Sequence, residues 1–231
     1  MTYGESRTGK TFTMFGNDFG GFTQYGVAHQ AVQQILAHKN SMKNEEDCHV
    51  YMSMMQIKNN VVNDLISGKT NEHIGLDLRE SDGSKVHVQG LSQISIESLH
   101  QFESVLAFGL VSVEKPAHVI VSFQIDTRIL SNPDKPSKEG GNQMRQSTLH
   151  LVDLAGEGWN FEDYQKFSVV EETSETKDLI YLRNIMHSAA QKQPNISFSE
   201  SKLCHFLKPV ISGSMLTQII CTASSSVASL Q

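Results

Sequence analysis

Residues 4–11, Gly-Glu-Ser-Arg-Thr-Gly-Lys-Thr, fit the pattern G-x-x-x-x-G-K-[ST] completely. The two glycines let the backbone curl so that its N–H groups point inward at phosphate oxygens. In such a loop Lys10 would reach the β- and γ-phosphates as a point charge, and the Thr11 hydroxyl would ligate Mg²⁺. A helix starting near Lys10 would add the positive end of its dipole. The alternative is an ordinary glycine-rich turn, because chance matches to this pattern occur.

A second candidate element runs through residues 149–156, where an apolar stretch ends in Asp153 and is followed by Gly156. In P-loop NTPases an Asp at the carboxyl end of a neighbouring strand lies near Mg²⁺. The N–H of the glycine can contact the γ-phosphate and respond to its loss. The alternative is a core strand whose Asp caps the next turn. The phosphate loop upstream favours the paired interpretation.

These residues must be positioned by alternating strands and helices. Periods of about two residues or short apolar runs predict strands over residues 49–57, 86–90, 118–125, 147–154 and 216–222, and residues 61–66 close a further short apolar segment. Apolar residues at helical spacing predict helices over residues 27–37, 96–110, 176–190 and 201–210. Prolines, glycines and charges predict an exposed loop over residues 131–143. The alternation indicates an α/β sheet with helices on both faces.

Composition narrows the class of protein. The 231 residues suit one domain, and a 39% hydrophobic content is enough for a sizeable core. A net charge of −6 without a long basic run argues against nucleic acid and a membrane surface, although a local basic patch could still meet an acidic partner. Three cysteines lie far apart, which indicates neither a zinc site nor a disulfide framework.

Six stretches resemble, in order, motifs of the kinesin motor domain family. The first two are YGESRTGKTFTM at residues 3–14 and QIKNNVVNDLI at residues 56–66, which look like the family's Y-G-Q-T-G-x-G-K-T-[YF]-T-M and E-I-Y-N-E-x-V-x-D-L-L. The others are LVDLAG at 151–156, TKDLIYLRNIM at 176–186, FSESKL at 198–203 and the stretch 216–222. Each motif is weak alone, but their shared order is specific.

The resemblance implies a P-loop NTPase fold with a mixed central β-sheet, and ATP hydrolysis coupled to movement along microtubules in the cytoplasm. It implies that ATP or ADP binds to Gly4, Glu5, Ser6, Arg7, Thr8, Gly9, Lys10, Thr11 and Phe12. Mg²⁺ would be held by Thr11 and Asp153, and Asp153 and Gly156 would form the second switch. The tubulin-facing residues would include Lys177, Asn184 and Lys202. The same helix could also pack its leucine stripe into the core, using its opposite face.

Departures from the family pattern are concentrated in the first switch, N-x-x-S-S-R-S-H. Residues 111–118 stand in its place, and of its motif only His118 is kept. Lys115 and Ala117 replace the two serines, and Pro116 replaces the arginine. Because hydrolysis depends mostly on positioning and charge stabilisation, we expect turnover to be lower by orders of magnitude.

Other departures concern charge. The acid of the second switch falls at Glu157, one place from its usual position relative to Gly156. Glu5 and Arg7 bring charges into the phosphate loop, and Ser199 removes a cation from the expected tubulin-facing side.

Only three residues precede Gly4, and a buried strand typically has about five. The family's first strands would lie before Met1 and its last helix after Gln231, so residues 1–231 are expected to form a partial motor domain with an incomplete sheet. We therefore expect the strand within 216–222 to be poorly anchored. Alternatives to a working motor are a non-catalytic module that binds microtubules or another motor chain, a fragment without independent function, and an unrelated P-loop NTPase.

Overall fold

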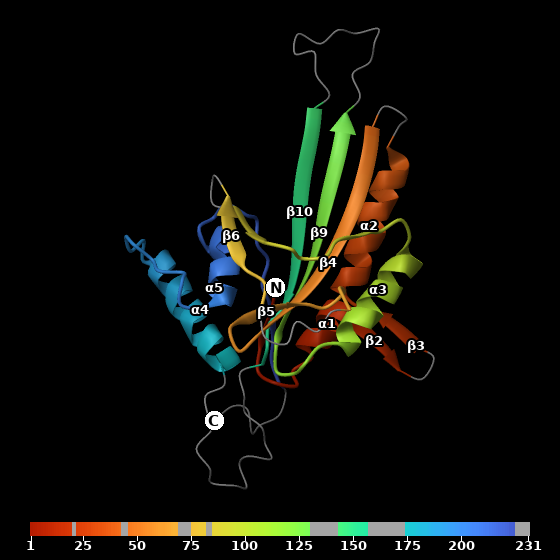
Figure 1. The fold of residues 1–231 in the computed structure, drawn as a ribbon. Coiled ribbons are helices and arrows are strands. Elements are labelled where there is room, and N and C mark those ends of the chain that lie inside the picture. Colours follow the sequence, from red (N-terminus) through yellow and green to blue (C-terminus); the bar gives the residue numbers. More distant parts are fainter. Residues whose placement is uncertain are drawn as a thin grey trace.

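The computed structural model describes residues 1–19, 22–42, 46–68, 75–81, 85–129, 143–156 and 174–224. Its main sheet has the strand order β11-β1-β10-β9-β4-β5, and β8 pairs with β4 (Figure 1). These strands are β1 (Thr2–Gly4), β4 (Glu46–Lys58), β5 (Val61–Asp64), β8 (Ile94–Ser95), β9 (His118–Ile129), β10 (Gln143–Asp153) and β11 (Ile220–Thr222). Two separate hairpins are β2 (Gly16–Phe19) with β3 (Phe22–Tyr25), and β6 (Leu78–Ser81) with β7 (Lys85–Val88).

The described helices are α1 (Lys10–Phe15), α2 (Val27–Ser41), α3 (Leu99–Val111), α4 (Ser174–Ala190), α5 (Lys202–Phe206) and α6 (Lys208–Ile211). None of them is long and apolar enough to cross a bilayer. The strands β4, β9 and β10 form a long antiparallel ladder, whereas β1 runs parallel to both β10 and β11. The sheet is therefore mixed, as predicted.

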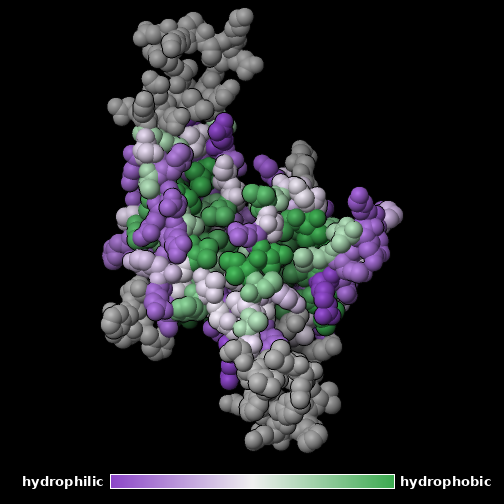
Figure 2. All heavy atoms as spheres, turned by 180° about the vertical axis from the view of Figure 1, so that it is seen from behind, coloured by the Kyte–Doolittle hydropathy of each residue, from purple (hydrophilic) through white to green (hydrophobic). Residues whose placement is uncertain are grey.

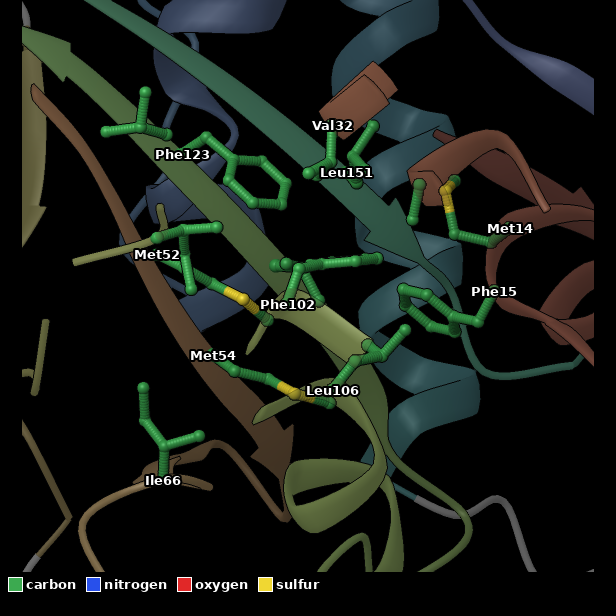
Figure 3. Packing of buried hydrophobic residues seen from close by; sticks show 14 of the residues in the cluster. Met14, Phe15, Val32, Met52, Met54, Ile66, Phe102, Leu106, Phe123 and Leu151 are labelled. Atoms are coloured by element: carbon green, nitrogen blue, oxygen red, sulfur yellow. The ribbon is translucent and has the colours of Figure 1, made fainter. Parts of the chain in front are cut away.

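One face of the ladder packs against α1, α2 and α3. Its strands contribute Met52, Phe123 and Leu151, which meet Val32 of α2 and Phe102 of α3 (Figure 3). These side chains are all nearly or fully buried. At Gly109 of α3 an added Cβ would lie 2.3 Å from the Met54 sulfur, so a larger residue could not fit between α3 and β4 without displacing Met54.

The opposite face packs against α4, α5 and α6. Met55 of β4 and Ile120 of β9 belong to this second core, together with Leu179, Leu182 and Phe206. Successive residues of a strand point to opposite faces, so Met54 enters the first core and Met55 the second. Helices thus cover both faces, which confirms the predicted architecture. Viewed from behind, hydrophobic side chains gather in the middle of the molecule, and hydrophilic ones follow the edge formed by α4 (Figure 2).

On the face of the sheet that carries the second core, polar residues of β4, β9 and β10 line a hollow of about 550 Å³ between the β6–β7 hairpin and α6. Ser122 and His150 lie on its floor, with the hydroxyl 2.7 Å from the imidazole Nδ1. In the strand predicted over residues 147–154, residues 151–154 are buried, whereas Ser147 and Thr148 are exposed. These two side chains are polar, and no described helix covers this part of β10, which explains their exposure.

Two sequence predictions at the C-terminal end are wrong. The strand expected over residues 216–222 is only Ile220–Thr222, and it is well anchored, because all three residues pair with β1. The helix expected over residues 201–210 is interrupted at Leu207. Pro209 explains the interruption, since its nitrogen cannot donate the hydrogen bond that a continuous helix would need. Most of the predicted loop, residues 130–142, lies outside the described residues.

Candidate nucleotide site

The phosphate loop connects β1 directly to α1. Gly9 has a φ of 94° and Arg7 a φ of 65°, so the loop turns through left-handed backbone conformations before the helix begins at Lys10. Gly4 has a φ of 152°, and an added Cβ there would lie 2.2 Å from the carbonyl oxygen of Thr222. The first glycine of the motif is therefore required by the close approach of β11.

Lys10 lies inside this loop. Its side chain is 6% exposed, and its ammonium donates to the carbonyl oxygens of Gly4, at 2.9 Å, and of Glu5. These bonds hold the positive charge at the mouth of the curl formed by residues 4–9. A bound phosphate would find this cation beside the first N–H groups of α1, which have no partner within the helix.

Thr11 and Asp153 bring two oxygen ligands together. The Thr11 hydroxyl donates to Asp153 Oδ2 at 2.6 Å, and the Thr2 hydroxyl donates to Oδ1 at 2.8 Å. Burial raises the pKa of Asp153, while both hydroxyls and the charges of Lys10 and Lys115 act in the opposite direction. A hydroxyl beside a desolvated carboxylate is the kind of oxygen pair that Mg²⁺ prefers, so the residues present fit a magnesium ion.

Gly156 lies against the phosphate loop. A Cβ added to it would be 2.5 Å from Ser6 Cα and 2.7 Å from the Ser6 nitrogen. Only glycine allows this contact between the end of β10 and the loop. The second-switch sequence is thus brought to the phosphate loop, although Glu157 lies outside the described residues.

The segment that replaces the first switch, residues 112–117, is fastened to β4. The Glu114 carboxylate pairs with Lys58 at 2.9 Å, and the Glu114 N–H donates to the Gln56 side chain at 3.0 Å. Residues 113–117 contain no hydroxyl group. Lys115 is close enough to Asp153 for its charge to lower the pKa of that carboxyl group. This segment therefore offers the site a cation in place of two serines.

His118, the first-switch residue that the chain keeps, belongs to the core. It is 0% exposed, and its Nδ1 accepts a hydrogen bond from the Ala155 N–H at 3.0 Å. Burial lowers the pKa of this imidazole to about 4, against a smaller raising effect from Glu175. His118 is therefore neutral near pH 7 and links the start of β9 to the second switch.

The family model for the kinesin motor domain matches residues 1–231. This chain belongs to the kinesin motor domain family. It is 25% identical over 228 residues to Kinesin-like protein KIN-14R of Arabidopsis thaliana, covering 94% of this chain and 20% of the relative. It is 27% identical to Kinesin-like protein KIN-7L of Oryza sativa subsp. japonica, covering 97% and 35%. Kinesin-related protein 11 of Dictyostelium discoideum is 28% identical, with coverage of 96% and 33%.

The chain thus spans between a fifth and about a third of the length of these curated kinesin relatives. Kinesin motor domains bind nucleotide and microtubules as a family.

The residues expected to face tubulin lie on the surface of α4 and α5. Lys177 and Asn184 are exposed and seven residues apart, so they share one face of α4. Lys202 begins α5, and its ammonium is 3.8 Å from Asp77. Phe12, expected near the nucleotide, is 47% exposed and so is not held in the core.

Three contacts of this kinesin site were missed from the sequence. Thr2 bonds Asp153, the Thr8 and Thr222 hydroxyls are 2.5 Å apart, and Lys115 acts on Asp153. The first two depend on the register of β1 against β10 and β11. Lys115 has a signal in the sequence, because it is a cation within a nucleotide-switch motif.

Proposed function

We propose that residues 1–231 form a partial kinesin motor domain that binds Mg²⁺ with ADP or ATP, docks on microtubules and hydrolyses ATP slowly. The observation that carries the proposal is the 2.6 Å contact between Thr11 and Asp153 beside a buried Lys10. Residues from two separate motifs, 142 positions apart, meet where a phosphate-bound cation would lie. A structural turn would not require this meeting.

Within the proposed site, the backbone of residues 4–9 and the Lys10 ammonium bind the phosphates. Thr11 and Asp153 hold Mg²⁺, which when bound neutralises charge on the phosphate oxygens. Gly156 lies where a γ-phosphate could contact its N–H. Glu5 and Arg7 place opposite charges in the loop, and the exposed Arg7 offsets Glu5.

Slow hydrolysis is supported by the first-switch segment. Residues 113–117 have no hydroxyl group to orient an attacking water, the Ser112 hydroxyl is bonded to the Phe108 carbonyl of α3, and Glu114 fastens the segment to Lys58 and Gln56. Pro116 replaces the arginine and cannot form an ion pair with the second switch. Losing such positioning groups typically costs about 10²-fold or more in rate each.

Docking on microtubules is supported by the hydrophilic face of α4 and the start of α5, which present Lys177, Asn184 and Lys202. A cationic patch is suited to an acidic surface such as tubulin, despite the net charge of −6. The second candidate function is a passive module that binds microtubules or another motor chain. The altered first switch favours it, and the Lys10–Thr11–Asp153 arrangement opposes it.

The decisive experiment is binding of a fluorescent ADP analogue with Mg²⁺ to the wild-type chain and to Lys10→Ala. We expect Lys10→Ala to weaken binding at least a hundredfold. Lys39→Ala is the matched control, since Lys39 is partly buried but pairs with Glu97 from the last turn of α2. Absence of binding to the wild-type chain would contradict the motor assignment.

Co-sedimentation with microtubules then separates the two candidate functions. A motor domain should bind with an affinity that differs between ADP and a non-hydrolysable ATP analogue. Affinity that ignores the nucleotide would support the passive module instead.

A further inference from the structure

A buried polar cluster lies between the second switch and α4. Glu175 and Asp178, in the first two turns of α4, are 2% and 3% exposed, and His118 is 0% exposed. Carboxylates and imidazoles are rarely buried this deeply unless they are paired, because burial without a partner is costly. None of these groups contacts the phosphate loop in the mechanism proposed above, so the cluster needs a separate explanation.

The hydrogen bond from Ala155 fixes the tautomer of His118. Since Nδ1 accepts from the Ala155 N–H at 3.0 Å, the neutral ring carries its proton on Nε2. Nε2 faces Asp178 Oδ2 at 3.7 Å. Among the described residues, neither atom has a partner at standard hydrogen-bond geometry, although the Glu175 backbone also interacts with the imidazole and acts to raise its pKa. A donor and an acceptor therefore face each other about half an ångström beyond hydrogen-bond length.

Asp178 and Glu175 connect this gap to the outer surface. The Asp178 side chain is hydrogen-bonded to Ser201, which caps α5, and its carbonyl accepts from the Cys204 thiol at 3.9 Å. Glu175 accepts from the Asn59 N–H at 2.9 Å in the turn between β4 and β5. The adjacent Asn60 accepts from the Lys202 N–H at 2.6 Å. A displacement of the first turns of α4 would thus be felt at the start of α5.

We infer that His118 is a positioning residue that couples the second switch to α4 by closing or opening the Nε2–H···Oδ2 bond to Asp178. A shift of Ala155 carries the imidazole with it, because the Ala155 N–H is bonded to the same ring. In one arrangement the bond is open, as seen here at 3.7 Å; in the other it is closed and pulls α4 inward. This inference rests on the proposed function, in which Gly156 responds to the nucleotide.

Two substitutions distinguish the hydrogen bond between Ala155 and His118 from the contact between His118 and Asp178. In His118→Asn the amide oxygen can take the place of Nδ1 and accept from Ala155, but no group reaches Asp178. In His118→Leu both interactions are lost. We expect hydrogen exchange to quicken at least fivefold in residues 174–182 for both variants, and at the Ala155 amide only for His118→Leu.

The functional readout is the change that Mg²⁺–ADP causes in the exchange of α4. His118→Asn should bind the fluorescent ADP analogue within about threefold of the wild-type affinity, yet lose the nucleotide response of residues 174–182. A purely structural role would quicken exchange equally with and without nucleotide, which would overturn the inference. His150→Asn is the matched control: this half-buried histidine lies on the same side of the sheet, pairs with Ser122 and should keep the response.

A double-mutant cycle in the nucleotide-free chain tests the link independently of nucleotide binding. The effect of the double variant His118→Asn/Asp178→Asn on the hydrogen-exchange rates of α4 should differ at least threefold from the product of the two single effects. Additivity would overturn the inference even if the chain binds nucleotide. Non-additivity in a chain that fails to bind Mg²⁺–ADP would support the link and contradict the proposed function.

Discussion

The phosphate loop and the first-switch segment both approach Asp153, but they meet it with different chemistry. The loop places the Thr11 hydroxyl 2.6 Å from the carboxylate, whereas the first-switch segment contributes only the charge of Lys115. The loop is shaped by Gly4, whose side-chain space is filled by the Thr222 backbone, and by Gly9, whose φ is 94°. The switch segment is anchored to β4 through Glu114. In the proposed site, nucleotide binding and hydrolysis would therefore be separable, because different segments would supply them.

The largest effect should come from Gly156→Ala, at the contact between the second switch and the phosphate loop. The added Cβ would lie 2.5 Å from Ser6 Cα, so one of two backbones must move. We expect the free energy of unfolding to fall by about 2–3 kcal/mol and affinity for the ADP analogue to fall at least tenfold. Urea denaturation and fluorescence titration measure both quantities.

Gly213→Ala is the control for Gly156→Ala. Nothing lies within 4 Å of its added Cβ, so only the strain of its φ of 79° should be felt. Its expected cost is about 1 kcal/mol, with nucleotide affinity unchanged. An equal loss of affinity in both variants would show that the Gly156 contact has no special role at the site.

The next effect is a pH dependence from His118, where the first-switch segment joins the core. Burial lowers its pKa from 6.5 to about 4, so the unfolded chain takes up the proton first as the pH falls. The contribution of this residue to the free energy of unfolding is fully present above pH 6.5 and is lost as the pH falls toward 4. At pH 5 the loss is roughly 2 kcal/mol. Asp178 acts in the opposite direction, because burial raises its pKa.

Urea denaturation at pH 7 and pH 5 isolates the His118 contribution. The difference in unfolding free energy between the two pH values should shift by about 2 kcal/mol when wild type is compared with His118→Asn. The wild-type chain should lose more stability on acidification than the variant. Equal differences in the two chains would mean that His118 is solvated in the folded state.

A smaller effect is expected for Thr11→Ala, which removes one of two proposed magnesium ligands. In the wild-type chain, chelating Mg²⁺ should weaken binding of the ADP analogue. In Thr11→Ala this dependence on Mg²⁺ should shrink about tenfold, because Asp153 alone remains. Thr13→Ala, two residues later in α1, is the control. An undiminished dependence on Mg²⁺ would place the ion elsewhere.

The smallest effect is expected for Glu114→Gln, in the segment that replaces the first switch. The Glu114 carboxylate is 69% exposed, so its ion pair with Lys58 should be worth at most about 1 kcal/mol. We expect nucleotide affinity to stay within twofold of wild type. A tenfold loss would show that the first-switch segment takes part in binding, and the contrast drawn above would be wrong.

Much of the fold could be predicted because burial on both faces leaves a strong pattern. Strands β4 and β9 are rich in apolar residues, and the stripe of α4 places Leu179 and Leu182 on one side. The phosphate loop was identified because its glycines and Lys10 have fixed spacing. These signals are local, so a single sequence is enough to find them.

Contacts between distant segments could not be predicted in the same way. The bond from Thr2 to Asp153 depends on a register that joins residues 151 positions apart. The anchoring of β11 on β1 was predicted wrongly because a three-residue strand is too short for its pattern to show pairing. Glu175 and Asp178 are buried although acidic residues are usually exposed, and only the packing of α4 on the second core reveals this burial.

The pairing of β1 with β11 has a consequence for synthesis. Near the amino end of β1, the Met1 amine donates to the Gln218 carbonyl across 217 positions. Closing so long a loop is slow, and folds dominated by such contacts acquire them late. Synthesis must therefore continue about 220 residues beyond β1 before this strand gains β11 as its second neighbour. Until then, β1 has an unpaired edge, and chaperones have time to bind it.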